Sequence, residues 1–158
     1  MKDQNHNSDY SKELLRLVKQ SMWANYKWIE FVYSQPDPEI RPRELLGHLL
    51  DSEKIWFERI EGEQKTQDSF NVLTKEELLK GFEEHRQVFQ NLIATRLEED
   101  IRFKRDSGVE YHARVSDIIQ HLITHGYHHK GQLALYYARK GVKYPNTDHI
   151  NFLIENKL

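Results

Sequence analysis

Residues 116–141 read SDIIQHLITHGYHHKGQLALYYARKG. Apolar side chains recur in this stretch at the three- and four-residue spacing of an amphipathic α-helix. Ser116 is a suitable N-cap residue, and Gly141 fits the left-handed position that follows many helices. We therefore expect one helix that runs to about Lys140 and has an apolar face that the rest of the chain must cover.

Three earlier stretches of the chain have the same helical periodicity. Ser8 or Asp9 can cap the first stretch, and Pro42 fits the first turn of the second. Thr74 and Glu77 form a capping box that opens the third. The predicted helices span about residues 8–33, 42–62 and 74–97, with a frayed tail at 1–7 and a polar loop over 62–73.

The pattern changes between the third and fourth helices. Apolar and charged residues alternate in Ile101-Arg-Phe-Lys-Arg105, and Asp106-Ser-Gly108 supplies a turn, so a short β-hairpin is predicted. A short terminal helix is expected over residues 147–156. Four long amphipathic helices in 158 residues predict an all-α fold. We expect a single four-helix-bundle domain over residues 1–158, with the hairpin inserted before the last long helix.

Composition narrows the classes of function. The chain has 23 Lys and Arg against 25 Asp and Glu, and this formal charge of −2 argues against a dedicated nucleic-acid binder. It has no cysteine, which excludes a thiolate ligand or a thiol nucleophile. The polar N-terminus lacks a signal core, and no apolar run approaches the roughly 18 residues of a membrane span. We expect a cytoplasmic protein with neither a membrane nor a nucleic-acid partner.

Four of the nine histidines lie within nine residues, from His121 to His129. Histidines at positions i and i+4 point the same way from a helix and commonly bind divalent transition metals. A turn of about 100° per residue from His121 places five apolar side chains at about 60–120°: Val115, Ile118, Leu122, Leu133 and Tyr136. His125 then lies at about 40° and His129 at about 80°, whereas His128 lies at about −20°, toward solvent. His125 and His129 are therefore the favoured pair.

A third ligand should come from another helix. His48 lies at the edge of the apolar stripe of the second helix, and Leu45, Leu49 and Trp56 fall at about 60–100° from it. The weaker candidates lie in the tail, a charged stretch, the hairpin and the terminal segment: His6, His85, His112 and His149. Helical phase thus favours His48, His125 and His129 as the ligands of one divalent metal ion. The alternative is that the histidines belong to a solvated helix face.

Three other side chains are candidates for the surroundings of such a site. Glu53 falls at about 140° from His48, inside the apolar stripe, where a carboxylate needs a partner. It either orients a ligand histidine or acts as a general base, or else it pairs with Arg or Lys from a neighbouring helix. His121, one turn before His125, either hydrogen-bonds near the site or is solvated. Asn25 either hydrogen-bonds near the site or is simply exposed.

These residues also carry a family resemblance. The segment His125-Gly-Tyr-His-His-Lys-Gly-Gln132 resembles the signature of the DinB-like (DNA-damage-inducible) superfamily. Trp23-Ala-Asn25 is similar to an early motif of that family, and the segment from Leu46 to Trp56 resembles its second-helix motif. The hairpin that leads into Arg114-Val-Ser-Asp117 also fits. The resemblance spans nearly the whole chain, with the motifs in the family's order.

The resemblance implies a four-helix bundle with down-up-up-down connectivity, often as a homodimer. It also implies a zinc or nickel ion bound by three histidines, with open positions for water, and the matching positions here are His48, His125 and His129. The family includes thiol S-transferases and isomerases that use bacillithiol or mycothiol. The implied partner is therefore a small-molecule substrate, such as a low-molecular-weight thiol.

Three neutral ligands would leave the full charge of a divalent ion in place, which lowers the pKa of a bound water toward about 7. Such a water favours hydrolysis, whereas a bound thiol favours S-transfer. Because the chain has no cysteine, the thiol would have to be a cosubstrate. The alternatives are a non-catalytic bundle that binds a metal or a small ligand, and a helical interaction protein whose histidines are incidental.

Overall fold

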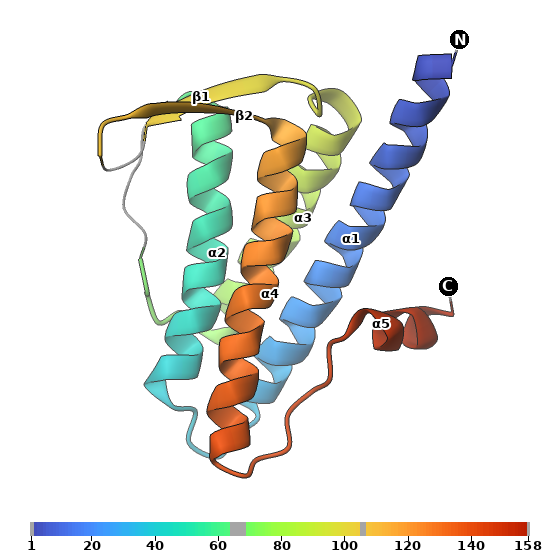
Figure 1. The fold of residues 1–158 in the computed structure, drawn as a ribbon. Coiled ribbons are helices and arrows are strands. Elements are labelled where there is room, and N and C mark those ends of the chain that lie inside the picture. The colour runs from blue at the N-terminus through green and yellow to red at the C-terminus, as the bar shows by residue number, and fades with distance from the viewer. Residues whose placement is uncertain (1, 64–68, 105–106, 158) are drawn as a thin grey trace.

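The computed structural model describes residues 2–63, 69–104 and 107–157. Its elements in chain order are α1 (Lys2–Tyr33), α2 (Ile40–Ile60), α3 (Lys75–Thr95), β1 (Asp100–Lys104), β2 (Glu110–Arg114), α4 (Val115–Arg139) and α5 (His149–Asn156). The expected all-α bundle with a hairpin before the last long helix is confirmed (Figure 1). No helix among these residues has both the length and the apolar character needed to cross a bilayer.

The four long helices have the down-up-up-down order that the resemblance implied. In Figure 1, α1 runs downward, α2 and α3 both run upward, and α4 runs downward again. The connection between α2 and α3 must therefore return along the length of the bundle. Within the expected polar loop, residues 64–68 lie outside the described part of the chain, as do residues 105–106 of the hairpin turn.

The apolar stripes of the four long helices meet in one core. Its largest fully buried side chains come from all four helices and include Trp28, Leu45, Leu46, Leu78, Phe82, Phe89, Ile118, Ile119 and Leu133. Burying an apolar side chain of this size contributes about 1.5–3 kcal/mol. The core therefore fixes the facing surfaces of α2 and α4, from which the predicted ligands project.

Two expected helix starts are wrong. The helix α1 begins at Lys2 instead of after a tail at 1–7. Since residues 2–8 contain neither Pro nor Gly, extending an existing helix through them costs little compared with starting one. The helix α4 begins at Val115 without a side-chain cap, so Ser116 is not its N-cap. Its first backbone amides donate instead to the carbonyls of Glu99 (2.9 Å, from Val115) and Leu97 (3.1 Å, from Ser116).

Other local signals are confirmed. The Thr74–Glu77 capping box is present: Glu77 N–H donates to Thr74 Oγ1 at 3.2 Å, and Thr74 N–H donates to Glu77 Oε2 at 2.7 Å. Gly141 follows α4 with a φ of 67°. The hairpin pairs β1 with β2 in antiparallel register, Ile101 opposite Ala113. Buried Phe103 on β1 packs against Trp56 of α2 with 4.9 Å between ring centroids, so the hairpin covers one end of the α2–α4 pair.

Candidate metal centre

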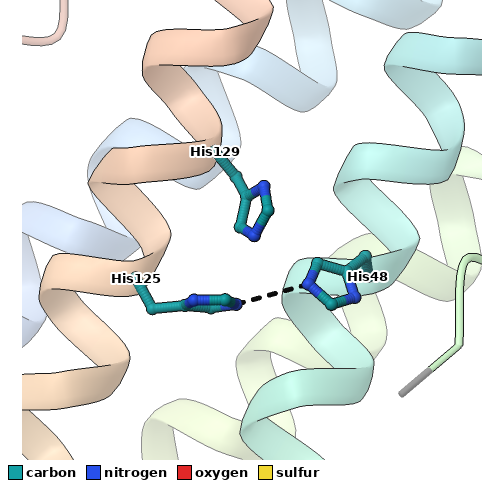
Figure 2. Close-up of side chains that lie close together, drawn as sticks. All are labelled: His48, His125 and His129. Atoms are coloured by element: carbon teal, nitrogen blue, oxygen red, sulfur yellow. Dashed lines mark hydrogen bonds between the residues drawn. The ribbon is translucent and has the colours of Figure 1, made fainter.

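Two helices supply the three histidines that helical phase favoured. His125 and His129 lie one turn apart on α4, and His48 faces them from α2. One ring nitrogen from each of the three lies within 4.8 Å of the other two. The Nε2 atoms of His48 and His125 are 3.3 Å apart. Figure 2 shows the three rings pointing toward a common space between the two helices.

A backbone carbonyl sets the tautomer of His48. Its Nδ1 lies 3.1 Å from the carbonyl oxygen of Ser69. A carbonyl oxygen only accepts hydrogen bonds, so Nδ1 must carry the proton and donate it. In a neutral imidazole the second nitrogen is then unprotonated. That nitrogen is Nε2, the atom that faces His125, so His48 presents a lone pair to the shared space.

The side chain of Gln132 sets the tautomer of His129. Its Oε1 lies 2.9 Å from Nδ1 of His129, while its Nε2 lies 3.2 Å from Nε2 of His128. Both contacts are hydrogen bonds when Nδ1 of His129 donates, which leaves Nε2 of His129 unprotonated. Burial lowers the pKa of His129 and the neighbouring His48 lowers it further, although the bond to Gln132 opposes the shift. His129 is thus held as the neutral imidazole, the form that binds metals.

The donor set fits a divalent transition metal. Ser52 Oγ lies 3.4 Å from Nε2 of both His48 and His125, so these three atoms border one small space. Lone pairs this close repel each other unless a proton or a cation lies between them. Three neutral imidazole nitrogens are the ligands of several catalytic zinc sites, and imidazole also suits nickel.

The three histidines differ in exposure. His48 and His129 are buried, at 4% and 8% exposed, whereas His125 is only half-buried. Phe70, which is 44% exposed, stacks in parallel on the His48 ring with 4.2 Å between ring centroids. The solvent-facing edge of the group therefore consists of His125 and Phe70.

The sequence matches the family model of the DinB family over residues 41–157, a range that contains all three histidines and the helices that carry them. The chain belongs to the DinB family. No curated protein matches it. DinB membership agrees with a metal-associated bundle, so the three-histidine group is the candidate metal centre of this DinB protein.

Glu53 does not approach the three histidines. As its helical phase indicated, the side chain is buried, at 6% exposed. Its Oε2 lies 2.9 Å from Nδ1 of His85 on α3, and both side chains are largely covered. His85 was a weaker metal candidate because of its charged neighbours, yet it shares the stripe of Phe82 and Phe89. The partner of Glu53 is therefore a histidine from α3, neither a metal ligand nor the expected Arg or Lys.

Lys130 adds a second charge to the bundle interior. It is 3% exposed, and its Nζ has no hydrogen-bond partner among the residues that the structure describes. Burial lowers the pKa of Lys130 to about 8, and the charge of Glu53 opposes that shift. Gly126 makes room for it, since a Cβ there would lie 3.2 Å from Lys130 Nζ and 3.7 Å from Ser21 Oγ of α1.

The other two candidates in the DinB bundle lie in different environments. His121 is exposed and stacks on His125 with 5.5 Å between ring centroids, while Trp56 contacts it edge-on at 5.4 Å. It therefore borders the metal centre at its hairpin side. Asn25 is 2% exposed, so the exposed alternative is wrong. Its Oδ1 lacks a hydrogen-bond partner within the described ranges.

Sequence reasoning missed four groups that contact the histidines: Ser52, the Ser69 carbonyl, Phe70 and Gln132. Two of them left a signal, because Ser52 is one turn after His48 and Gln132 is nearly one turn after His129, positions that share a helix face. Ser69 acts through its backbone, which leaves no trace in the side-chain pattern.

Proposed function

We propose that this DinB protein is a cytoplasmic, homodimeric, metal-dependent enzyme that acts on a small molecule as a hydrolase or a thiol S-transferase. His48, His125 and His129 would bind one divalent ion, zinc or nickel. One observation carries the proposal: ring nitrogens of these residues converge within 4.8 Å, and the Ser69 carbonyl and Gln132 turn the proton-bearing nitrogens of His48 and His129 away from the centre.

A divalent ion bound by three neutral imidazoles keeps its charge and supplies Lewis acidity to a coordinated water or thiol. The residues of the chain provide orientation. Ser69 and Gln132 hold two imidazoles with Nε2 inward, and Ser52 Oγ can donate to an acceptor at the centre, since it borders His48 and His125. Exposed His121, which stacks on His125, is a titratable side chain on the hairpin side of the centre. With no cysteine in the chain, a reacting thiol must arrive as a cosubstrate.

The low exposure of the centre favours a second candidate function. His48 and His129 are buried and Phe70 covers the outer face of His48, as in a metal site that stabilises a bundle or binds a ligand without turnover. This candidate predicts one bound metal ion per chain and stoichiometric binding of a small thiol without formation of product.

Metal analysis of the purified protein tests the shared basis of both candidates. We expect about one zinc or nickel ion per chain in the native protein and a nearly complete loss of that ion in His125→Ala. His112→Ala, which removes an exposed histidine from β2, is the matched control and should retain the metal. Unchanged metal content in His125→Ala would contradict the proposal.

Activity assays separate the two candidates. The metal-loaded protein is incubated with ester and amide substrates, and separately with a small-molecule thiol plus an electrophile. Turnover that disappears in His125→Ala supports the enzyme. Thiol binding at one equivalent, with no product from either set, supports the non-catalytic bundle.

A further inference from the structure

Three consecutive residues within the α2–α3 connection, Ser69, Phe70 and Asn71, attach to one face of α2. Ser69 Oγ donates to the Asp51 carboxylate, the Phe70 ring stacks on His48, and the backbone of Asn71 lies against Gly47. Residues three and four apart on a helix are neighbours on its surface, so Gly47, His48 and Asp51 form one continuous patch. We name residues 69–71 the His48 clasp.

Gly47 is needed for the close approach of the His48 clasp. A Cβ built at Gly47 would lie 1.9 Å from the carbonyl oxygen of Asn71, far inside contact distance. Any other residue at this position would therefore push the backbone of the clasp away from α2. The neighbouring residue is His48, so the displacement would act directly beside the metal centre.

Asp51 holds the other end of the clasp. Its Oδ2 accepts hydrogen bonds from Ser69 Oγ and, at 3.4 Å, from Asn71 Nδ2. Asn71 Nδ2 also donates to Ser69 Oγ at 3.0 Å, which closes a small network. A carboxylate acceptor makes these bonds stronger than bonds between neutral groups. The network fixes Ser69, whose carbonyl accepts the Nδ1 proton of His48.

We propose that Asp51 is a positioning residue for the metal centre, and that it acts on His48 through Ser69. Asp51 fixes Ser69, the Ser69 carbonyl holds the Nδ1–H tautomer and the ring orientation of His48, and Nε2 is thereby presented to the metal. Phe70 completes the clasp by covering the His48 ring. The guanidinium carbon of Arg41 lies in turn 5.3 Å from the centroid of the Phe70 ring. This inference rests on the proposed metal site.

Zinc affinity is the first measurement, made by competition with a chromophoric chelator. Loss of a group that orients a metal-bound histidine typically weakens metal binding about 10–100-fold. We expect Asp51→Ala to show a loss of that size, and Asp51→Asn, which retains an acceptor oxygen, to recover most of it. Glu61→Gln is the matched control, because Glu61 ends α2 but pairs with Arg96. It should bind zinc like the native protein.

The second measurement reads the tautomer of His48 without any metal. Long-range ¹H–¹⁵N spectra of the metal-free protein should show His48 protonated at Nδ1, and Asp51→Ala should convert it to a mixture of tautomers. Gly47→Ala should give the same mixture by displacing Asn71 while Asp51 remains. Circular dichroism confirms that each variant retains its helices.

The outcomes distinguish the two proposals. If the native protein binds zinc, and Asp51→Ala and Gly47→Ala bind it equally well with His48 still protonated at Nδ1, the positioning role is overturned while the metal site stands. If the native protein binds neither zinc nor nickel but the tautomer changes as expected, the proposed function fails and the action of Asp51 on His48 stands.

Discussion

Two interior histidine clusters in this bundle are built in opposite ways. At the metal centre, three like side chains converge, with His48 and His125 Nε2 atoms 3.3 Å apart. Between α2 and α3, His85 meets the carboxylate of Glu53 at 2.9 Å, and the charge of Glu53 also acts on buried Lys130. In the second cluster the ring of His85 pairs with a carboxylate of the same chain, Glu53. The first cluster brings like groups together, and this arrangement is favourable only when a proton or a cation lies between the facing nitrogens.

The contrast separates a ligand-binding cluster from a structural one. Buried polar groups without partners cost stability, so protein interiors pair them. The metal centre is an exception, because His48 and His129 present lone pairs to a shared space, where each needs a proton or a cation as its partner. The presence of a histidine is therefore weak evidence for a metal site. The group that hydrogen-bonds to its second ring nitrogen is stronger evidence. At His48 and His129 that neighbour is an acceptor that turns the lone pair inward.

The largest expected effect separates His48 from His85. Removing one of three ligands from a transition-metal site should weaken metal binding about 1,000-fold, given apparent binding free energies of about 10–16 kcal/mol for structural zinc. We expect that loss in His48→Ala, measured by chelator competition, and near-native affinity in His85→Ala. Equal metal loss in both variants would contradict the assignment of metal binding to the first cluster alone.

The next effect tests the structural cluster. Glu53→Ala removes the carboxylate partner of His85 and the negative charge that acts on buried Lys130. Breaking a buried pair in this way typically costs about 3–5 kcal/mol, so the free energy of unfolding in urea should fall by about 3 kcal/mol. Metal content should stay near one ion per chain. Glu155→Ala, which breaks an exposed pair with Lys27, should change stability by less than about 1 kcal/mol.

Metal removal should act on the first cluster alone. A ligand at about 100 times its dissociation constant stabilises the native state by about 2.7 kcal/mol, which for a domain of this size raises the melting temperature by about 5–10 °C. We expect a chelator to reverse that shift in the native protein and in Glu53→Ala to the same extent. It should leave the melting temperature of His48→Ala unchanged. A chelator effect that depended on Glu53 would show that the two clusters are coupled.

The smallest expected effect concerns Gln132. Gln132→Ala removes the acceptor that holds the Nδ1–H tautomer of His129, and we expect zinc affinity to fall about 10-fold, near the lower limit for groups that orient metal ligands. Gln90→Ala, a change of the same residue type on α3, is the control. Native affinity in Gln132→Ala would show that burial alone keeps Nε2 of His129 inward.

Periodicity was sufficient to predict the bundle and the convergence of the histidines. The apolar stripe of α4 distinguished His125 and His129 from His128, and the stripe of α2 placed Glu53 inside the core. The partner of Glu53 could not be predicted from periodicity, because it depends on how α3 is rotated against α2. The start of α4 was mispredicted because its first amides bond to backbone carbonyls of Leu97 and Glu99. The Ser69 carbonyl was missed for the same reason, although Gly47 beside His48 is a sign of a close backbone approach.

The placement of the ligands on α2 and α4 has a consequence for the order of unfolding. His48 and His125 are 77 residues apart, so a bound ion would cross-link the chain into a loop that encloses α3 and the hairpin. By the chain-entropy argument used for disulfides, closing a loop of this length disfavours the unfolded state by about 4.5 kcal/mol. The helices α1 and α5 lie outside that loop and can detach without opening it. The metal-bound protein should therefore exchange the amides of α1 and α5 with solvent before those of the enclosed segment.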